Sequence, residues 1–254
     1  MNETGSETAA RFQASPIADG GTPVEMWTDW IHTLASANLT ECPGMTVIAP
    51  HPDDETLGVG GTMAMLSAAG VDVQVVSVSD GGAAYPGLSA ASRAKLERLR
   101  RAEVRRSLRL LGAGEPIRLG MPDGELCRHE RRMTERIAAL LADSPAGRWC
   151  AATWRGDGHP DHEAVGRASA AAAAETGAVF VEYPVWMWHW ARPDDAVAPW
   201  NRARRVRLSN DALTTKTVAA QCFPSQTQPT PDGYTVLPPP VVSRLLTIGE
   251  VVFV

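Results

Sequence analysis

The first two thirds of the chain alternate between short apolar runs and amphipathic segments. Residues 45–50 and 71–79 are apolar, β-branched runs of strand length, and each ends in a polar turn. A segment with helical spacing of its apolar residues follows each run, at 62–69 and at 92–111, and each segment is ended by a glycine. This order of strand, turn and helix predicts repeated βαβ units.

The same alternation continues to about residue 183. Further strands are expected near 116–119, 149–153 and 179–183, with helices near 131–142 and 160–175. Such a series predicts an α/β fold, in which a mostly parallel sheet carries helices on both faces. Ligands of these sheets bind at the carboxyl ends of the strands, so functional residues are expected in the loops that follow them.

The two ends of the chain lack this alternation. Residues 1–23 are polar, Gly-rich and aperiodic, which predicts a flexible N-terminal tail, and 24–34 has the spacing of an amphipathic helix. Beyond Gly177, short strands such as 204–208, a Trp-rich segment and a Pro-rich run predict a looped, β-rich cap over the site. Because no repeat or long polar linker interrupts 24–254, this part is expected to be one domain.

Composition narrows the function classes. With 254 residues and 44% hydrophobic content, the chain is long enough for a large buried core. The formal net charge is -5, and no basic block outside the Arg-rich stretch 93–109 suggests nucleic-acid binding. There is no secretory pattern at the N-terminus and no apolar run of the ~18 residues that span a bilayer. We therefore expect a cytoplasmic protein that binds a small molecule, with no nucleic-acid or membrane partner.

Two clusters of ligand-type side chains each follow a predicted strand. The first is HPDDE at 51–55, where His51 and Asp54 offer two ligands of a catalytic metal site that needs three. The second is HPDH at 159–162, where His159 and His162 offer the third. A lone His beside an Asp at a helix start is commonly only a cap or a surface pair. Two such clusters at one sheet edge, using three of the six histidines, favour a metal site.

These motifs, in a Rossmann-like α/β domain, resemble those of the LmbE or PIG-L deacetylases over roughly residues 45–250. The resemblance implies that His51, Asp54 and His162 bind zinc and that Asp53 is the general base. It also implies that His159 stabilises the oxyanion and acts as an acid. The implied activity is zinc-dependent removal of an N-acetyl group from an amino sugar, such as N-acetylglucosamine on a small-molecule glycoconjugate.

The chain departs from part of that family before its second motif. Certain relatives carry a Tyr two residues before HPDH, whereas this chain has Asp157. Assistance by a tyrosine is therefore not expected, and His159 is expected to carry more of the oxyanion stabilisation. A site made of two His and one Asp also accepts Fe²⁺ in place of Zn²⁺.

Residues that contact the substrate are marked by weaker patterns. By the same resemblance, Arg100 of an R-x-x-E helix contacts substrate and Asp123 binds sugar hydroxyls; the alternatives are an exposed ion-pair face and a turn aspartate before glycine. Asp80 either lines the pocket or makes an Asx turn. In the Trp-rich segment, Trp188 and His189 are candidates for a wall that stacks on a sugar ring, although such aromatics are usually core.

The glycines at 58, 60 and 61 do not form a dinucleotide fingerprint, because Met63 stands where the third glycine is required. They are expected to let a loop pass close to the metal and a helix pack on the sheet. Two other functions fit the same sequence: an amidase acting on a thiol conjugate, and a non-catalytic sugar-binding module. The high Ala and Arg content and the Trp-rich segment favour a role in antibiotic biosynthesis; the sequence does not specify the aglycone or the oligomeric state.

Overall fold

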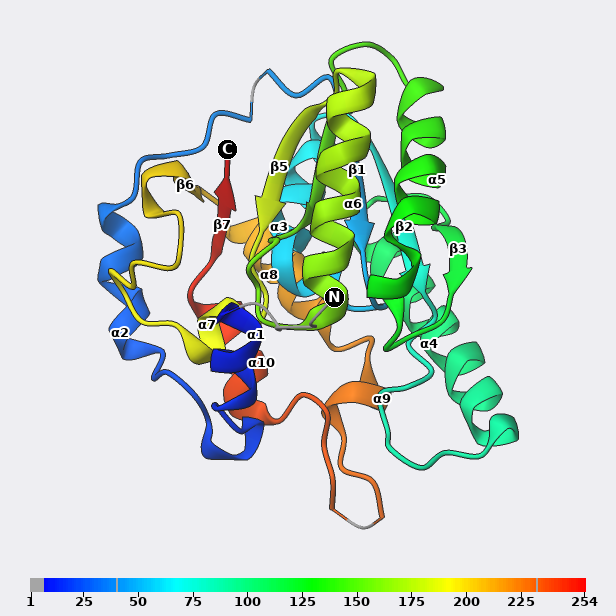
Figure 1. The fold of residues 1–254 in the computed structure, drawn as a ribbon. Coiled ribbons are helices and arrows are strands. Elements are labelled where there is room, and N and C mark those ends of the chain that lie inside the picture. Colours follow the sequence, from blue (N-terminus) through cyan, green and yellow to red (C-terminus); the bar gives the residue numbers. More distant parts are fainter. Residues whose placement is uncertain (1–6, 40, 232) are drawn as a thin grey trace.

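The computed structural model describes residues 7–39, 41–231 and 233–254 (Figure 1). Within these ranges a seven-stranded sheet has the order β3-β2-β1-β4-β5-β7-β6. Strands β1 to β5 are parallel to one another where they pair, whereas β7 is antiparallel to both β5 and β6. The predicted mostly parallel sheet is therefore confirmed. The strands are β1 Gly44–Ala49, β2 Asp72–Ser79, β3 Ile117–Met121, β4 Trp149–Thr153, β5 Val179–Tyr183, β6 Ala203–Val206 and β7 Glu250–Phe253.

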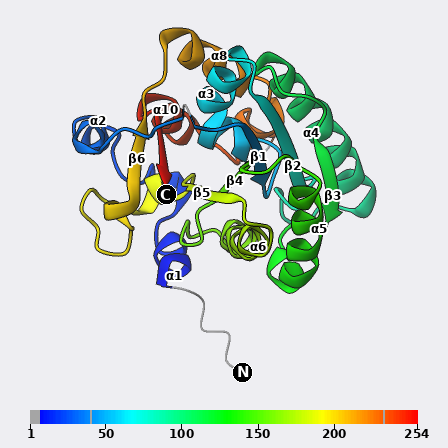
Figure 2. The ribbon, with the colours of Figure 1, turned by 90° about the horizontal axis from the view of Figure 1, so that it is seen from above.

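Helices cover both faces of the sheet (Figure 2). On one face lie α3 (Asp54–Ala68), α4 (Ala90–Leu110) and α8 (Asn210–Ala220), and on the other α5 (Glu130–Ala142) and α6 (Pro160–Thr176). Each face has its own apolar core. Successive side chains of a strand point to opposite faces, so Val47 of β1 belongs to one core and Ile48 to the other. The remaining helices are α1 Glu7–Gln13, α2 Glu25–Thr28, α7 Met187–Trp190, α9 Pro224–Thr227 and α10 Pro239–Thr247, with 3-10 turns at Ile17–Asp19, Trp30–Thr33, Leu126–His129 and Trp200–Arg202. No helix of the described ranges has the length and apolar character to cross a membrane.

The strand order creates a crevice in the middle of the sheet. Strands β1 and β4 are neighbours, but the chain proceeds outward from β1 to β2 and β3, and in the opposite direction from β4 to β5. Loops that follow β1 and β4 therefore diverge, which is the switch point where ligands of such sheets bind. The segments 51–55 and 159–162 begin in these loops and continue into the first turns of α3 and α6.

Helix α3 begins at Asp54, so the expected loop around the glycines is wrong and these glycines are helical. They are needed for packing, because a Cβ on Gly58 would lie 2.3 Å from Tyr183 Cδ2 and one on Gly61 would lie 2.6 Å from Leu208 Cδ1. Between them Val59 leaves the helical region, with φ -137° and ψ 22°, and α3 is kinked there.

A buried ion pair occupies the kink of α3. The carboxylate of Glu250 in β7 accepts hydrogen bonds from the backbone N–H groups of Gly61 (2.7 Å) and Thr62 (2.8 Å), just after the kink. Lys216 of α8 lies 2.9 Å from the same carboxylate, and neither side chain is more than 1% exposed. Two elements distant in sequence, β7 and α8, are thus joined to α3 at one carboxylate.

The N-terminal part differs from the predicted tail over 1–23. Glu7–Gln13 form α1, and residues 1–6 lie outside the described residues. The partners of α1 are remote in sequence, since the Phe12 ring lies 5.1 Å from that of Trp186 and Arg11 pairs with Asp195. Tertiary contacts therefore fix a helix that local periodicity does not indicate. The helix expected over 24–34 is divided into α2 and a 3-10 turn.

The C-terminal part contains the predicted loops and short strands, but the strands extend the main sheet and helices α8 and α10 accompany them. Helix α8 gives little signal in the sequence. Its buried face includes Ala212, Lys216 and Ala219, which have helical spacing but form no stripe of large apolar side chains.

Candidate active site

The first motif enters the site through a strained backbone. Asp53, immediately before α3, has φ 137° and ψ -28°, a region that residues other than glycine rarely adopt. The side chain of Glu55 folds back and accepts a hydrogen bond from the N–H of Asp53 at 3.2 Å. Such strain persists only where surrounding contacts enforce it, and it clusters at functional sites. This conformation orients the carboxylates of Asp53 and Asp54 differently.

His51, Asp54 and His162 meet at one point. Asp54 Oδ2 lies 3.1 Å from His51 Nδ1 and 3.3 Å from His162 Nε2, and the three ligand atoms lie within 4.8 Å of one another. His162 Nε2 is fully buried and has no hydrogen-bond partner of acceptable geometry. A buried nitrogen of this kind beside a carboxylate fits a site for a metal ion, and two imidazoles with one carboxylate are ligands that catalytic zinc accepts.

The other nitrogen of His51 faces two further carboxylates. His51 Nε2 lies 3.0 Å from Asp123 Oδ1 and 3.3 Å from Asp161 Oδ2. These carboxylates also accept backbone N–H groups, Asp123 from Ala83 at 2.6 Å and Asp161 from Gly124 at 2.7 Å. A metal-binding imidazole normally donates its second N–H to a carboxylate in this way. The arrangement leaves Nδ1 of His51 for the ion.

Asp157, noted in the sequence only as a departure from relatives, holds His162. Its Oδ2 lies 2.8 Å from His162 Nδ1. The same buried carboxylate accepts the backbone N–H groups of Val185 (2.9 Å), Trp186 (2.9 Å) and Met187 (3.0 Å). The contact directs Nε2 of His162 toward Asp54. The spacing of five residues before His162 was the one signal in the sequence, and it does not reveal the three backbone contacts.

The two adjacent aspartates have opposite electrostatic environments. Burial raises the pKa of Asp53 to about 8, although Arg100 opposes the shift. Burial acts in the same sense on Asp54, but His162 and His51 outweigh it and hold the pKa of Asp54 well below its ordinary value. A cation held by Asp54 and the two imidazoles would also favour the ionised form of Asp53.

His159 begins α6 and lies beside this group. Its Nδ1 accepts a hydrogen bond from the N–H of Asp161 at 3.2 Å, so a proton of the neutral ring resides on Nε2. Burial, together with His162 and His51, lowers the pKa of His159 to about 3. The ring is therefore neutral at physiological pH and retains one N–H donor.

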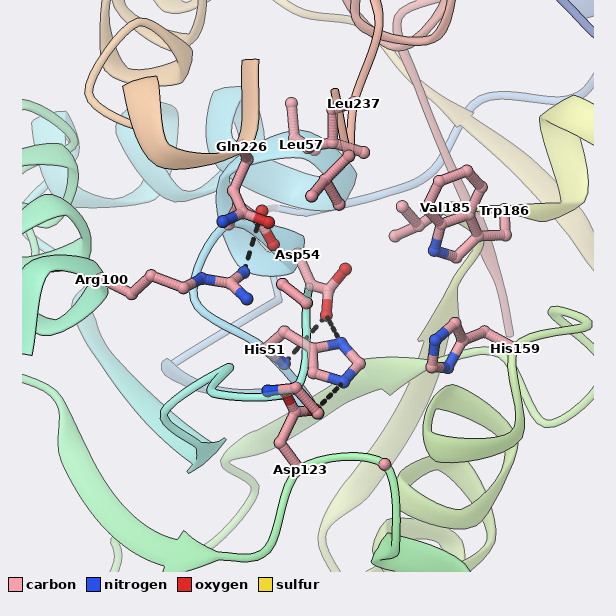
Figure 3. Close-up of a pocket in the computed structure, with 15 residues that line it drawn as sticks. His51, Asp54, Leu57, Arg100, Asp123, His159, Val185, Trp186, Gln226 and Leu237 are labelled. Carbon is pink, nitrogen blue, oxygen red and sulfur yellow. Dashed lines mark hydrogen bonds and ion pairs between the residues drawn. The ribbon is translucent and has the colours of Figure 1, made fainter. Parts of the chain in front are cut away.

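These groups open into a cavity that encloses ≈ 610 Å³ of space, including the part open to solvent. Figure 3 shows His51 and Asp54 at its centre, with Arg100 on one side and His159 on the other. Most of the remaining side chains that line the cavity are apolar. The lining residues are His51, Asp53, Asp54, Leu57, Ala83, Ala84, Arg100, Asp123, Gly124, His159, Val185, Trp186, Gln226, Val236 and Leu237.

Arg100 lies inside the site. It is 2% exposed and donates to the carbonyl oxygens of Gly81 (3.0 Å) and Pro52 (2.9 Å) and to Asp53 Oδ2 (3.2 Å). The alternative of an exposed ion-pair face is therefore wrong for this residue. Arg100 joins the loops after β1 and β2 and holds one oxygen of Asp53.

Gln226 was not singled out in the sequence, yet it lines the cavity. Glu103, one turn after Arg100, accepts a hydrogen bond from the Ser225 hydroxyl at 2.5 Å. The oxygen of this hydroxyl in turn accepts a hydrogen bond from Gln226 Nε2 at 2.9 Å. Because a carboxylate only accepts hydrogen bonds, the hydroxyl must donate to Glu103 and accept from the amide nitrogen of Gln226. This order fixes the orientation of the Gln226 amide. Among the described residues Gln226 Oε1 has no hydrogen-bond partner, and Gln226 and Arg100 both line the cavity (Figure 3).

Three predicted substrate residues do not line the cavity. Asp80 is held by Arg101 at 2.9 Å and also pairs with Arg118. Trp188 packs edge-on against Trp27 in the core, and His189 Nε2 lies 3.1 Å from the carbonyl oxygen of Ser15. Asp80, Trp188 and His189 thus lie outside this cavity, since the turn of α7 directs these two aromatics inward. Trp186, just before α7, faces the cavity.

A parallel α/β sheet with a His2Asp group and a separate buried carboxylate at its switch point defines a Rossmann-like protein with a candidate metal centre. Residues 46–173 match the family described as PIG-L, GlcNAc-PI de-N-acetylase. The chain belongs to this family, and both sequence motifs lie within the matched region.

Individual relatives support the same assignment. A 1D-myo-inositol 2-acetamido-2-deoxy-alpha-D-glucopyranoside deacetylase of Mycobacterium avium is 33% identical over 155 residues, covering 49% of this chain and 49% of the relative. A diacetylchitobiose deacetylase of Thermococcus kodakarensis is 31% identical over 121 residues, covering 47% and 45%. The chain thus matches about half the length of these curated relatives. The solved structure of an A40926 pseudoaglycone deacetylase aligns with a TM-score of 0.57 and 26% identity, covering 71% of this chain and 81% of that one.

Proposed function

We propose that this chain is a metal-dependent deacetylase that removes an N-acetyl or other acyl group from an amino sugar, N-acetylglucosamine on a small-molecule glycoconjugate. The observation that carries the proposal is the meeting of His51 Nδ1, Asp54 Oδ2 and His162 Nε2 beside the separate carboxylate of Asp53. Membership of the PIG-L family supports it, as do relatives named for GlcNAc-inositol and chitobiose substrates.

In this proposal His51, Asp54 and His162 hold a divalent ion, zinc in the first instance, with Fe²⁺ also compatible with the ligands. The ion supplies Lewis-acid chemistry, polarising the acyl carbonyl and making a water easier to deprotonate. Asp53 removes the proton. Arg100 holds Oδ2 of Asp53 at 3.2 Å, which leaves Oδ1 to act as the base.

His159 contributes on the other side of the cavity. With Nδ1 bonded to the N–H of Asp161, its Nε2–H donates to the carbonyl oxygen as negative charge develops there. A ring with a pKa of about 3 holds no spare proton at neutral pH. The departing amine therefore receives its proton from Asp53, which has just taken one from water.

The proposal extends to antibiotic biosynthesis through two supporting observations. The cavity has an apolar wall that includes Leu57, Trp186 and Leu237, which suits a substrate with an apolar aglycone or acyl chain. The A40926 pseudoaglycone deacetylase shares the fold at 26% identity.

One experiment tests the reaction class. Metal content of the purified protein is measured together with acetate release from N-acetylglucosaminyl-inositol, diacetylchitobiose and an aryl N-acetylglucosaminide. We expect about one divalent ion per chain and acetate release that a chelator abolishes. Protein that binds these sugars without metal and without turnover would instead be a sugar-binding module. Turnover only of an acylated thiol conjugate would identify the amidase alternative.

A further inference from the structure

Helix α1 lies outside the region that matches the family, yet it contacts the loop that carries His159 (Figure 1). Thr8 Oγ1 donates to Glu163 Oε1 at 2.5 Å, and the same oxygen accepts the N–H of Gly158 at 3.1 Å. Arg11 of α1 also pairs with Asp195 at 2.7 Å. The N-terminal helix is thus fastened to the start of α6 and to the loop after α7.

Phe12 is the α1 residue that reaches toward the site. Its ring centroid lies 5.1 Å from that of Trp186 and 6.1 Å from that of His159. Trp186 and His159 both line the cavity, whereas Phe12 does not. Phe12 therefore packs near two rings of the cavity wall without lining the cavity itself.

The loop is shaped for this approach. Gly158, immediately before His159, has φ +93°, and a Cβ there would lie 2.8 Å from the Cβ of Phe12. A side chain at 158 would separate α1 from the loop, and the backbone conformation also disfavours one. Close contact between Phe12 and the His159 loop thus depends on this glycine.

His159 has few other restraints on its ring. Among the described residues, its ring makes one hydrogen bond, that from the N–H of Asp161 to Nδ1. Three rings lie near it, with centroids of His51 at 5.1 Å, His162 at 4.9 Å and Phe12 at 6.1 Å. One hydrogen bond does not fix the rotation of a side chain by itself, so packing must contribute to the direction of Nε2–H.

We propose that Phe12 is a positioning residue for the deacetylation: it holds the His159 imidazole and the Trp186 indole in place, and the site is complete only when α1 is docked. The inference rests on the proposed function of His159. A misplaced catalytic group reduces the rate without any change in the metal ligands. The N-terminal segment thereby becomes part of the catalytic apparatus while contributing no atom to the cavity.

The test compares Phe12→Ala with Phe12→Leu and with Arg11→Ala. Arg11→Ala removes one ion pair of the same helix, while the bond of Thr8 to Glu163 and the contacts of Phe12 with both rings keep α1 docked. On diacetylchitobiose we expect kcat to fall about tenfold in Phe12→Ala, with most of the loss restored in Phe12→Leu and little change in Arg11→Ala. Metal content is expected to be equal in all three. Equal kcat losses in Phe12→Ala and Arg11→Ala would overturn the proposal.

A double-mutant cycle separates positioning from general stability. In a His159→Gln background, Phe12→Ala should reduce kcat by less than about twofold, because the group it positions is absent. The same tenfold loss in both backgrounds would show that Phe12 acts elsewhere and would reject the inference.

A readout without turnover keeps the inference distinct from the proposed function. In ¹⁵N-histidine spectra of the protein as purified, Phe12→Ala should shift or broaden the His159 signals, whereas Arg11→Ala should not. Absence of acetate release from every sugar would reject the proposed function alone. Unchanged His159 signals in Phe12→Ala would reject the positioning role whatever the activity.

Discussion

Asp53 and Asp54 are identical side chains one residue apart, and the strained backbone between them gives them different neighbours. Asp54 faces His51 and His162, while Asp53 faces the guanidinium of Arg100. Environments that move two pKa values apart divide the chemical roles of a pair of acids. The pKa of Asp53, raised by burial to about 8, and that of Asp54, held low, follow this pattern.

This division predicts different outcomes for two substitutions. Asp53→Ala should retain the metal and lose about 10²- to 10⁴-fold in kcat, the usual effect of removing a general base. His162→Ala should lose both metal and turnover. Metal analysis and acetate release on the same preparations check the pair. Equal metal loss in the two variants would reverse the assignment of base and ligand.

Asp157 offers a second test at the residue scale. It fixes His162 through a 2.8 Å contact, so Asp157→Ala should weaken metal affinity by about 10- to 100-fold, measured by competition with a chelator. Asp80→Ala is the matched control, because this half-buried aspartate pairs with Arg101 and Arg118 and does not line the cavity. The orienting role of Asp157 is refuted if both variants lose the same affinity.

The candidate metal ligands in the two motifs could be predicted from the sequence more readily than the residues that hold the site in place. His51, Asp54 and His162 have side chains of the type that binds metal ions, which marks them in the sequence, and the structure brings them together. Asp157 accepts backbone N–H groups, and Gln226 is held through its neighbour Ser225 by the remote Glu103; these contacts have no periodicity in the sequence. Trp188 was expected in the cavity and Trp186 was not, because the turn of α7 decides which aromatic faces inward.

At the scale of the elements, α4 supports the cavity with two residues three positions apart. Arg100 reaches the loops after β1 and β2, and Glu103 reaches α9 through Ser225. Neither pairs with the other in the contacts described. The helix is thus a common base for two walls of the site, and its R-x-x-E spacing reflects one face of a helix turned toward the interior.

The kink of α3 is predicted to depend on the ion pair of Glu250 and Lys216. Glu250→Gln leaves a buried ammonium without its counter-charge, so the free energy of unfolding should fall by about 3 kcal/mol or more, measured by urea denaturation. The control is Glu135→Gln, whose partner Arg131 is 91% exposed, and a change within about 0.5 kcal/mol is expected there. Equal losses in both variants would show that the buried pair has no special role.

The βαβ elements of the first two thirds were predictable, whereas the segments around them were less so. Strands β4 and β5 are short, mostly apolar segments, and they form at the predicted residues. Helix α1 depends on contacts with Trp186 and Asp195, residues more than a hundred positions away. Helix α8 buries a lysine. Local pattern therefore predicts elements that bury a uniform apolar face, and misses those whose partners are charged or distant.

At the scale of the whole molecule, metal binding should stabilise the fold, since the ligands come from the loops after β1 and β4. A metal present at about 100 times its Kd contributes ~2.7 kcal/mol, which corresponds to roughly 5–10 °C in Tm for a chain of this size. Chelation should lower Tm by about this amount. His162→Ala should show no response to the chelator, and a response equal to that of the unmodified protein would place the ion elsewhere.

The position of Glu250 also has a consequence for biosynthesis. This residue of β7 completes the kink of α3, whose first residue is the candidate ligand Asp54, so nearly two hundred intervening residues must be made before α3 takes its final shape. Domains begin to fold during translation, and contacts between distant residues form slowly. The metal centre is then among the last regions to mature, and a nascent chain that stops before β7 would capture the ion poorly.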